Sequence, residues 1–355
     1  MIRWRHGVVR SLGATWSTAL ELVVDIDSTA VNALAYVDQV GKPEVGDAVL
    51  LSTGALRLGL GTGGYAMVVA VPGRLPPDDE APGHLVKARY TPMQVTVLGV
   101  DEQDSPDHAV LRDADDLDGM PVVVADLHSA LPAVLAGLRL DRRQTRVAYV
   151  MTDGGALPLA FSRSVADLRD AGWLAGTVTV GQAYGGDLEA VTLHSGLLAA
   201  RLVLDAEVVV VTQGPGNLGS GTRWGFSGVA SGEAVNAVGV LGGRPVASLR
   251  VSGADPRARH RGISHHSLTA YGRVALVQAD VAVPHLPDEL GAEVRAQAAP
   301  LGNRHRLVGV SVDGLAQALR HSPAQLSTMG RGLDEDSAYF IAAAAAGRHA
   351  AALLA

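Results

Sequence analysis

The stretch Ala206–Ala237, AEVVVVTQGPGNLGSGTRWGFSGVASGEAVNA, decides the fold because it joins a strand, a loop and a helix in one segment. Val208 to Val211 are four consecutive β-branched residues, which is typical of a strand buried on both faces of a parallel sheet. The loop that follows is dense in glycine, so its backbone can approach a ligand closely. Its glycines are Gly214, Gly216, Gly219, Gly221, Gly225 and Gly228.

Residues 214–219 spell G-x-G-x-x-G, but the match to a dinucleotide-binding fingerprint is poor. In that fingerprint the third glycine already lies in the helix, whereas residues 220–226 still have loop composition, and Pro215 removes a backbone donor. We expect instead that backbone N–H groups and Arg223 hold an anionic group near the start of a helix. The structural alternative is a tight connection whose glycines serve only packing.

Composition indicates a globular protein and excludes several kinds of chemistry. The chain has 355 residues, enough for two domains, with 48% hydrophobic and only 18% charged residues. A buried interface in a homo-oligomer would explain the shortage of charge. The net charge of −7 and the absence of any Lys/Arg run argue against a nucleic-acid partner. The absence of cysteine excludes disulfides, thiolate nucleophiles and cysteine-ligated metal sites.

Targeting signals are also missing from the sequence. The start, MIRWRHGVVRSLG, has arginines but no apolar stretch of signal-peptide length, and no apolar run is long enough to span a membrane. We therefore expect a cytoplasmic protein with no membrane contact.

Residues 1–100 have the pattern of a small β-domain. Short apolar runs alternate with turn residues, and no helix of ordinary length fits between them. The predicted strands are 21–26, 30–37, 48–51, 66–71 and 94–100. This pattern predicts a small antiparallel barrel or sandwich.

The acidic run 101–119, DEQDSPDHAVLRDADDLDG, predicts a solvated linker, and a different pattern begins at Met120. Strands are predicted at 121–125, 146–151, 177–180, 208–211, 245–251, 274–283 and 306–311. Helices are predicted at 129–140, 156–171, 188–204, 232–241, 287–298, 314–320 and 336–354, with Asp187 as the N-cap of the third. This alternation over 120–355 predicts a Rossmann-like α/β domain, in which a doubly wound, mostly parallel sheet is covered by helices.

Polar or glycine-rich residues follow five consecutive predicted strands. In an open parallel sheet, ligands bind beyond the carboxyl ends of the strands, so these segments are expected to share one pocket. The segments are 126–128 (DLH), 152–155 (TDGG), 181–185 (GQAYG), 212–214 (TQG) and 252–255 (SGAD).

Candidate site residues come from these segments, from the glycine loop and from the histidine-rich segment Gly253–Arg273, which also contains His260, Arg257, Arg259 and Arg261. Acid–base chemistry is assigned to carboxylates and to histidines that titrate near neutrality: Asp126, His128, Asp153, His265 and His266. Ligand binding is assigned to Thr152, Gly154, Gln182, Gln213, Gly214, Gly216, Gly219, Gly221, Thr222 and Arg223. His265 and His266 are adjacent, so on a strand only one of them could face a given site.

Other site types have weaker support. Asp126, His128, Asp153 and one of His265 or His266 would form an oxygen and nitrogen set suited to zinc or manganese, but no metal-ligand spacing enforces it, and no metal site is predicted. No G-x-S-x-G elbow and no P-loop are present. The sequence identifies no cofactor.

Four segments carry a resemblance to a known family: GLGTGGY (Gly59–Tyr65), MTDGGALPLAFS (Met151–Ser162), TQGPGNLGSGTRWGFSG (Thr212–Gly228) and ISHHSLTAYGR (Ile263–Arg273). Through them, nearly the whole chain resembles an uncharacterised bacterial family, domain of unknown function 3866. The resemblance implies one recurring unit of this length in the bacterial cytoplasm. It implies no activity, cofactor or catalytic residue.

Two functions remain open from the sequence. The first is binding, and transformation by an enzyme, of a small anionic metabolite at the strand ends of the α/β domain. The second is a non-catalytic protein that senses a metabolite or docks a partner, because no complete catalytic motif is present and the chain is poor in charge.

Overall fold

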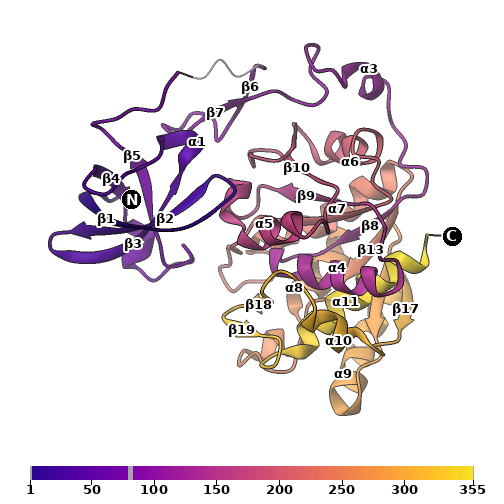
Figure 1. The fold of residues 1–355 in the computed structure, drawn as a ribbon. Coiled ribbons are helices and arrows are strands. Elements are labelled where there is room, and N and C mark those ends of the chain that lie inside the picture. Colours follow the sequence, from indigo (N-terminus) through magenta and orange to yellow (C-terminus); the bar gives the residue numbers. More distant parts are fainter. Residues whose placement is uncertain (1, 79–82, 355) are drawn as a thin grey trace. The chain divides into compact units, whose positions relative to one another are not determined.

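The computed structural model describes residues 2–78 and 83–354, which form two compact units (Figure 1). The first unit consists of Met1–Val97 together with Ala160–Ala166, and the second of Leu98–Leu159 and Asp167–Ala355. None of the helices in the described ranges is both long enough and apolar enough to cross a membrane.

The first unit is built on a closed five-stranded barrel, as the sequence pattern predicts. Its strands follow the order β1-β2-β3-β5-β4, and all pairs are antiparallel except β3 with β5. The barrel elements are β1 (Trp4–Trp16), β2 (Ala19–Ile26), β3 (Thr29–Tyr36), β4 (Ala48–Ser52) and β5 (Ala66–Ala70), with the short helices α1 (Val37–Val40) and α2 (Gly54–Arg57). A separate antiparallel pair is formed by β6 (Leu85–Lys87) and β7 (Val95–Val97).

Alternation of apolar residues fills the barrel interior. In β2, Leu20, Leu22 and Val24 are buried, and they belong to one core with Val49 and Leu51 of β4. The predictions omitted β1, because its apolar residues do not alternate regularly and its long ladder with β2 shifts register twice. They also extended the last strand to 94–100, whereas β7 spans only Val95–Val97 and Gly99 forms a single separate bridge with Glu189.

The short segment Ala160–Ala166 completes the first unit. The indole Nε1 of Trp16 donates to the carbonyl of Ala160 over 2.8 Å. The guanidinium of Arg163 lies 4.1 Å above the Trp16 ring and forms a 2.8 Å ion pair with Glu21. Two strands of the barrel are thus tied to a segment that is distant in sequence.

The second unit contains an eight-stranded parallel sheet, which confirms the predicted α/β class. The strand order is β11-β10-β9-β12-β8-β13-β16-β17, and every neighbouring pair is parallel. The strands are β8 (Pro121–Val124), β9 (Val147–Thr152), β10 (Gly176–Val180), β11 (Leu188–Ala190), β12 (Val208–Gln213), β13 (Arg244–Ser248), β16 (Asp280–Pro284) and β17 (Arg306–Val310). All six residues of β12 are buried, as its β-branched run predicts.

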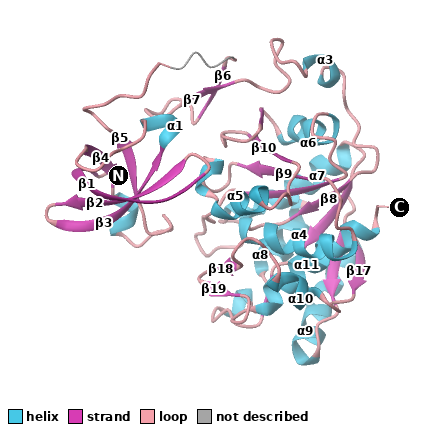
Figure 2. Ribbon diagram, in the orientation of Figure 1, coloured by secondary structure: helices cyan, strands magenta, loops and turns pink. Residues whose placement is uncertain are grey.

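Helices cover both faces of this sheet (Figure 2). Helices α4 and α11 pack on one face, and α6 and α7 on the other. The helices of the second unit and of its boundary are α3 (His108–Leu111), α4 (Leu131–Asp141), α5 (Arg163–Asp170), α6 (Leu193–Leu202), α7 (Ala230–Val240), α8 (His265–Thr269), α9 (Asp288–Ala298), α10 (Leu315–Arg320) and α11 (Ser337–Ala352). Short strand pairs are formed by β14 (Val251–Ser252) with β15 (Gly262–Ile263) and by β18 (Ser327–Thr328) with β19 (Arg331–Gly332).

The strand order contains a topological switch at β12. From β8 the chain continues to β9, β10 and β11 towards one edge, returns to β12 between β8 and β9, and then continues through β13, β16 and β17 towards the other edge. The carboxyl ends of β8, β9 and β12 are therefore neighbours. Open parallel sheets bind ligands at such a position.

The alanine-rich helix α11 packs closely on α4. A Cβ atom on Gly137 would lie 1.9 Å from the carbonyl oxygen of Ala344, and a Cβ atom on Gly347 would lie 1.9 Å from that of Val134. Only glycine permits this backbone approach. The small side chains of this segment thus serve helix packing.

In the second unit, three more predicted elements differ from the structure in kind or in bounds. Residues 188–204 are not one helix, because Leu188–Ala190 pairs with β10 as an edge strand and α6 begins after Thr192. The N-cap is Thr192, whose hydroxyl accepts from the backbone of Ser195, whereas Asp187 accepts from Thr177.

The other two differences concern irregular segments. In the predicted helix 156–171 only Arg163–Asp170 is α-helical. The predicted strand 274–283 begins at Asp280, because the preceding residues include the π-helical turn η5 (Ala270–Val274).

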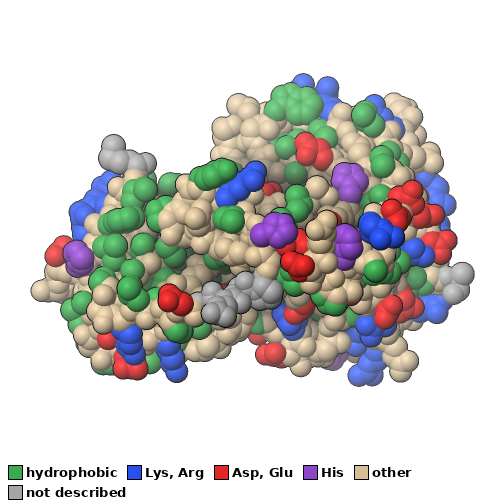
Figure 3. Space-filling view, turned by 90° about the horizontal axis from the view of Figure 1, so that it is seen from above, with side chains coloured by type: hydrophobic (Ala, Val, Ile, Leu, Met, Phe, Trp, Pro, Cys, Tyr) green, Lys and Arg blue, Asp and Glu red, His purple; other side chains and the backbone are tan. Residues whose placement is uncertain are grey.

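The acidic stretch 101–119 belongs to the second unit. Leu111 and Leu117 are buried in its core, and the short helix α3 contacts α6. On the face that Figure 3 shows, acidic and basic side chains are scattered among apolar and neutral ones. The low charge content of the sequence is thus visible on this surface.

Candidate functional site

The first part of the glycine-rich loop packs against the loop that follows β9. The N–H of Gly214 donates to Thr152 O over 3.1 Å, and the N–H of Ala156 donates to Pro215 O over 2.8 Å. A Cβ atom on Gly155 would lie 2.2 Å from Gly214 O and 2.6 Å from Gly216 O. Gly154 is similarly crowded by the Gln213 side chain. Gly155 therefore permits close contact between two loop backbones, and Gly154 leaves room for the Gln213 side chain.

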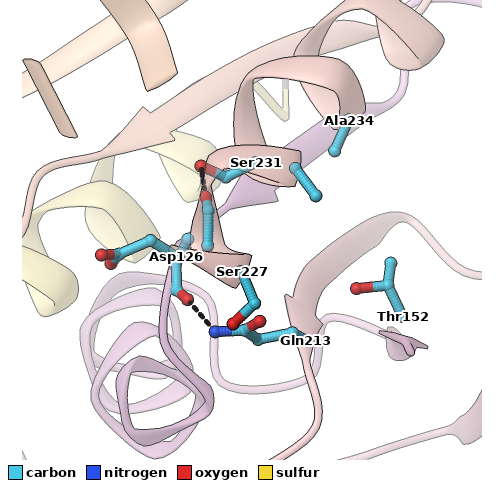
Figure 4. Close-up of a pocket in the computed structure, with 9 residues that line it drawn as sticks. Asp126, Thr152, Gln213, Ser227, Ser231 and Ala234 are labelled. Carbon is cyan, nitrogen blue, oxygen red and sulfur yellow. Dashed lines mark hydrogen bonds between the residues drawn. The ribbon is translucent and has the colours of Figure 1, made fainter. Parts of the chain in front are cut away.

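A small space, here called the strand-end cavity, lies where β8, β9 and β12 end (Figure 4). It is lined by Ala125, Asp126, Thr152, Gln213, Ser227, Gly228, Ala230, Ser231 and Ala234. Its volume is about 10 Å³, which is the space that one water molecule requires. The strand-end cavity is thus too small for a metabolite.

Gln213 holds the two sides of the strand-end cavity together. Its Nε2 donates to the backbone carbonyl of Asp126 over 2.9 Å and to Asn217 Oδ1 over 3.0 Å. Its Oε1 is buried without a hydrogen-bond partner among the described residues. In Figure 4 the carboxylate of Asp126 points away from Gln213 and Thr152.

His128 lies in a separate buried network. Its Nδ1 is 2.9 Å from the hydroxyl of Tyr149, which is also 2.9 Å from Thr212 Oγ1. Burial lowers the pKa of His128 to about 4 and raises the pKa of Tyr149, so both groups are neutral at pH 7.

Asp153 lies at the surface rather than in this network. Its Oδ2 accepts from the backbone N–H of Gln182 over 2.9 Å. A Cβ atom on Gly181 would lie 2.4 Å from Asp153 Oδ2, and the φ of 65° at this position also favours glycine. The hydrogen bond to Gln182 thus links the loops that follow β9 and β10.

The second part of the glycine-rich loop is exposed. Ser220 N donates to Gly225 O over 2.7 Å, and Gly225 N donates to Thr222 Oγ1 over 3.1 Å. These bonds close a compact turn that presents Arg223 to solvent. Gly221 has a φ of 81° and Gly216 a φ of 90°, and their conformations are accessible mainly to glycine.

Arg223 lies at the edge of a larger space, here called the arginine hollow, of about 670 Å³. It is lined by Gly221, Arg223, Arg259, His265, Leu268, Thr269, Gly272, Arg273, Gln297, Pro300 and Leu301. The three guanidinium groups come from the loop after β12, from the 3-10 turn η4 (Ala258–His260) and from η5. Within residues 2–78 and 83–354, none of these three arginines forms an ion pair, and no acidic residue lines the hollow.

Three histidine side chains form a cluster beside the arginine hollow. The ring centroid of His265 lies 5.0 Å from that of His260 and 4.4 Å from that of His266. One ring nitrogen from each histidine lies within 4.8 Å of the others. His265 also lines the hollow.

Local structure explains why adjacent histidines share this cluster. Ser264 caps α8, and its Oγ accepts from the N–H of His266 over 3.2 Å. His265 and His266 are the first residues of a helix, not of a strand, so the expectation that they face opposite directions is wrong. Phe226 stacks on the His266 ring with centroids 3.8 Å apart, which fixes the position of that ring.

The environment of the cluster disfavours protonated imidazole. Burial, aided by Arg250 and Arg257, lowers the pKa of His260 to about 3. Burial, the neighbouring His266 and Arg259 lower the pKa of His265 to about 4. Both rings are therefore neutral at pH 7 and can accept a hydrogen bond or coordinate a metal ion.

A buried frame of charged residues supports the cluster. It contains three carboxylates and three guanidinium groups: Asp126, Asp255, Asp336, Arg250, Arg257 and Arg331. Asp255 accepts two hydrogen bonds from Arg257, of 2.9 and 2.8 Å, which hold the pKa of its carboxyl group well below the usual range. Asp126 Oδ2 lies 3.6 Å from His266 Nδ1 and 4.0 Å from Arg250 Nη1.

The predicted site residues thus fall into separate groups. Asp126 of the frame lies beside His266 of the histidine cluster, and His265, Gly221 and Arg223 line the arginine hollow. Asp126, Thr152 and Gln213 line the strand-end cavity. The remaining predicted residues stand elsewhere: His128 with Tyr149, Asp153 with Gln182, Gly154, Gly214 and Gly216 in loop packing, and Gly219 and Thr222 in the exposed turn.

The sequence predictions did not select four residues that the structure places here: Arg250, Arg259, His260 and Arg273. Their only signal is the concentration of histidine and arginine between residues 250 and 273. No periodicity indicates which of them converge.

The barrel, the doubly wound sheet and the arginine-lined hollow define a two-unit α/β protein with a basic surface hollow. The chain belongs to the family described as "Protein of unknown function (DUF3866)", whose model matches residues 32–347. No curated protein matches the chain.

Proposed function

We propose that this protein binds a small anionic metabolite in the arginine hollow. The observation that carries the proposal is the convergence of Arg223, Arg259 and Arg273 on one open space with no acidic partner among the described residues. Elsewhere in the second unit, arginines such as Arg257, Arg306 and Arg348 are paired with carboxylates. Three guanidinium groups that repel one another are stabilised when an anion enters between them.

The chemistry of the hollow favours carboxylate or phosphate groups. Guanidinium presents two parallel N–H donors, which match the two oxygens of these groups. The side chains of Thr269 and Gln297 add neutral hydrogen-bonding groups to the lining, while Leu268 and Leu301 add apolar surface. A volume of about 670 Å³ fits a metabolite with two or three charged groups.

The position of the hollow also supports a binding role. Its lining residues belong to three segments, which follow the parallel strands β12, β13 and β16, and all three of its arginines come from the first two of these segments. In α/β proteins these segments carry the ligand contacts, because they vary without disturbing the sheet.

Calorimetric titration with a panel of anions tests the proposal. The panel contains inorganic phosphate, citrate, succinate and a nucleoside monophosphate, each titrated at two salt concentrations. At least one anion should bind with an affinity that falls as salt is added, because exposed charges are screened. Single changes Arg223→Ala, Arg259→Ala and Arg273→Ala should each weaken binding of that anion at least tenfold.

The matched control is Arg143→Ala, because Arg143 is an exposed arginine of the same unit with no ion pair to a described residue. This variant should bind the anion as the wild-type protein does. Equal affinity in the wild-type protein and in a variant lacking all three hollow arginines would contradict the proposal, as would the absence of binding by every anion of the panel.

A further inference from the structure

We propose that His260, His265 and His266 bind a divalent transition-metal ion, such as zinc, at the edge of the arginine hollow. The sequence patterns assign no such site, because H-x-x-x-x-H-H is not a standard ligand spacing. The assignment depends on the three-dimensional arrangement of the rings.

The nitrogen atoms of the cluster are positioned as a metal would require. One ring nitrogen from each histidine lies within 4.8 Å of the other two. Zinc bound to nitrogen at about 2.0–2.1 Å in tetrahedral geometry holds its ligand atoms about 3.4 Å apart. Small rotations of the three side chains therefore suffice to close the site around an ion.

Unused hydrogen-bonding capacity gives independent support. The Nε2 atom of His265 is buried and has no hydrogen-bond partner among the described residues. For His260 and His266, the ring contacts involve Nδ1, which lies 2.7 Å from Ser264 Oγ in His260 and 3.3 Å from Arg250 Nη1 in His266. A buried polar atom without a partner is costly, and a bound cation would remove this cost.

Residues around the cluster are suited to orient metal ligands. Ser264 Oγ lies 2.7 Å from His260 Nδ1, and Asp126 Oδ2 lies 3.6 Å from His266 Nδ1. Metal-bound imidazoles usually place their second nitrogen against a hydroxyl, carbonyl or carboxylate group. Asp126 Oδ2 has no hydrogen-bond partner among the described residues. It can take this role once Arg250 Nη1, which lies 3.3 Å from the same His266 Nδ1, moves aside.

Three histidine ligands leave one coordination position open for a water molecule or a ligand, which is the arrangement of a catalytic rather than a structural zinc site. His265 lines the arginine hollow, so this position is adjacent to the space assigned to the anion. The inference thus deepens the proposed function: an anionic oxygen that enters between the arginines would coordinate the metal. The metal site itself depends only on the three histidines.

Metal titration of the full chain tests the site directly. Protein stripped with a chelator is titrated with Zn²⁺ by calorimetry and with Co²⁺ by visible spectroscopy, and bound metal is counted by elemental analysis. One ion per chain is expected, with the visible spectrum of Co²⁺ bound to nitrogen. Each of His260→Gln, His265→Gln and His266→Gln should weaken Zn²⁺ binding at least tenfold.

Two controls keep the result interpretable. His128→Gln removes a buried histidine outside the cluster, and His194→Gln removes an exposed one, and both variants should bind metal as the wild type does. His265→Gln removes a ring whose Nε2 has no partner among described residues, so it should fold normally even if a change at the more buried His266 does not.

The outcomes separate the metal site from the anion site. Zn²⁺ binding retained in Arg223→Ala with loss of anion binding supports both proposals. Zn²⁺ binding without any anion binding supports the metal site and contradicts the proposed function. Anion binding by a protein that binds neither Zn²⁺ nor Co²⁺ overturns the metal site and leaves the proposed function standing, and metal binding that is equal in all three histidine variants also overturns it.

Discussion

The same glycine-rich loop forms part of the strand-end cavity and part of the arginine hollow, yet the two spaces differ in volume, in exposure to solvent and in the charge of their lining. Beside the strand-end cavity, the loop backbone contacts the β9 loop directly, and only about 10 Å³ remains free. At the arginine hollow, the loop is exposed, and about 670 Å³ is open. One segment thus forms both a closed packing contact and part of an open hollow.

The difference shows where unpaired polar groups are tolerated. At the closed end, the amide of Gln213 links two strand-end loops, and His128 pairs with Tyr149. At the open end, three arginines remain without an acidic partner among the described residues. An unpaired charge costs little free energy where water solvates it, and there it can still bind a ligand. At the closed end, the polar groups bind each other instead, so a polar residue at a strand end is by itself a poor indicator of function.

The largest effect is expected from filling the closed end. Gly155→Ala would place a Cβ atom 2.2 Å from Gly214 O and 2.6 Å from Gly216 O, so two loop backbones must separate. We expect the free energy of unfolding to fall by about 3–5 kcal/mol, measured by urea denaturation. A loss below about 1 kcal/mol would show that the loops are not in contact and would remove the distinction between the two ends.

The second effect concerns the burial of His128. Its pKa is about 4 in the folded protein and 6.5 when exposed, so the unfolded chain binds its proton more tightly. Stability is therefore complete above pH 6.5 and is lost as pH falls towards 4, by up to about 3 kcal/mol from this residue. His128→Gln should show a shallower loss over this range in denaturation curves measured at several pH values. Identical slopes for variant and wild type would mean that His128 is accessible to solvent.

A smaller effect is expected at Gln213. Gln213→Leu removes the donors to the Asp126 carbonyl and to Asn217, and should lower the free energy of unfolding by about 2 kcal/mol. Gln144→Leu changes an exposed glutamine and serves as the control, with an expected change within about 0.5 kcal/mol. If the two variants were equally stable, the amide of Gln213 would not link the loops.

The smallest effect is expected in the exposed turn. A Cβ atom on Gly219 would meet no atom closer than 4.0 Å, so Gly219→Ala should change stability by less than about 0.5 kcal/mol. Gly221→Ala has similar space but must hold a φ of 81°, which costs about 1–2 kcal/mol. Thermal denaturation of both variants separates the cost of the positive φ at Gly221 from the cost of steric crowding. If Gly219→Ala were as destabilising as Gly155→Ala, the space around Gly219 would not be open.

Continuous β-branched runs made the centre of the parallel sheet predictable. Val208–Val211 and Pro121–Val124 have the composition of strands that are buried on both faces, and they lie side by side in the structure. Edge elements were harder to predict, because their residues follow no strict period. Leu188–Ala190 forms a strand only through its pairing with β10, which is a tertiary interaction that local sequence does not encode.

The candidate site could be predicted only in part. Arg223 was selected because loops at strand ends carry ligand contacts, and His265 was selected because histidine titrates near neutrality. Both residues line the arginine hollow. Arg259 and Arg273 could not be distinguished from other arginines, because their convergence depends on the short turns η4 and η5. Asp153 was also selected because it follows a strand, yet its carboxylate accepts a hydrogen bond from the Gln182 backbone and does not line the hollow.

The membership of Ala160–Ala166 in the first unit has a consequence for the order of folding during synthesis. When the barrel strands have left the ribosome, Ala160 and Arg163 have not yet been synthesised. Ala160 O accepts the hydrogen bond from the Trp16 indole, and Arg163 forms the ion pair with Glu21. The N-terminal unit can therefore reach its final form only after more than sixty further residues have emerged. A fragment cut at Val97 would expose one face of Trp16, and a useful excised barrel must carry this later segment as a grafted peptide.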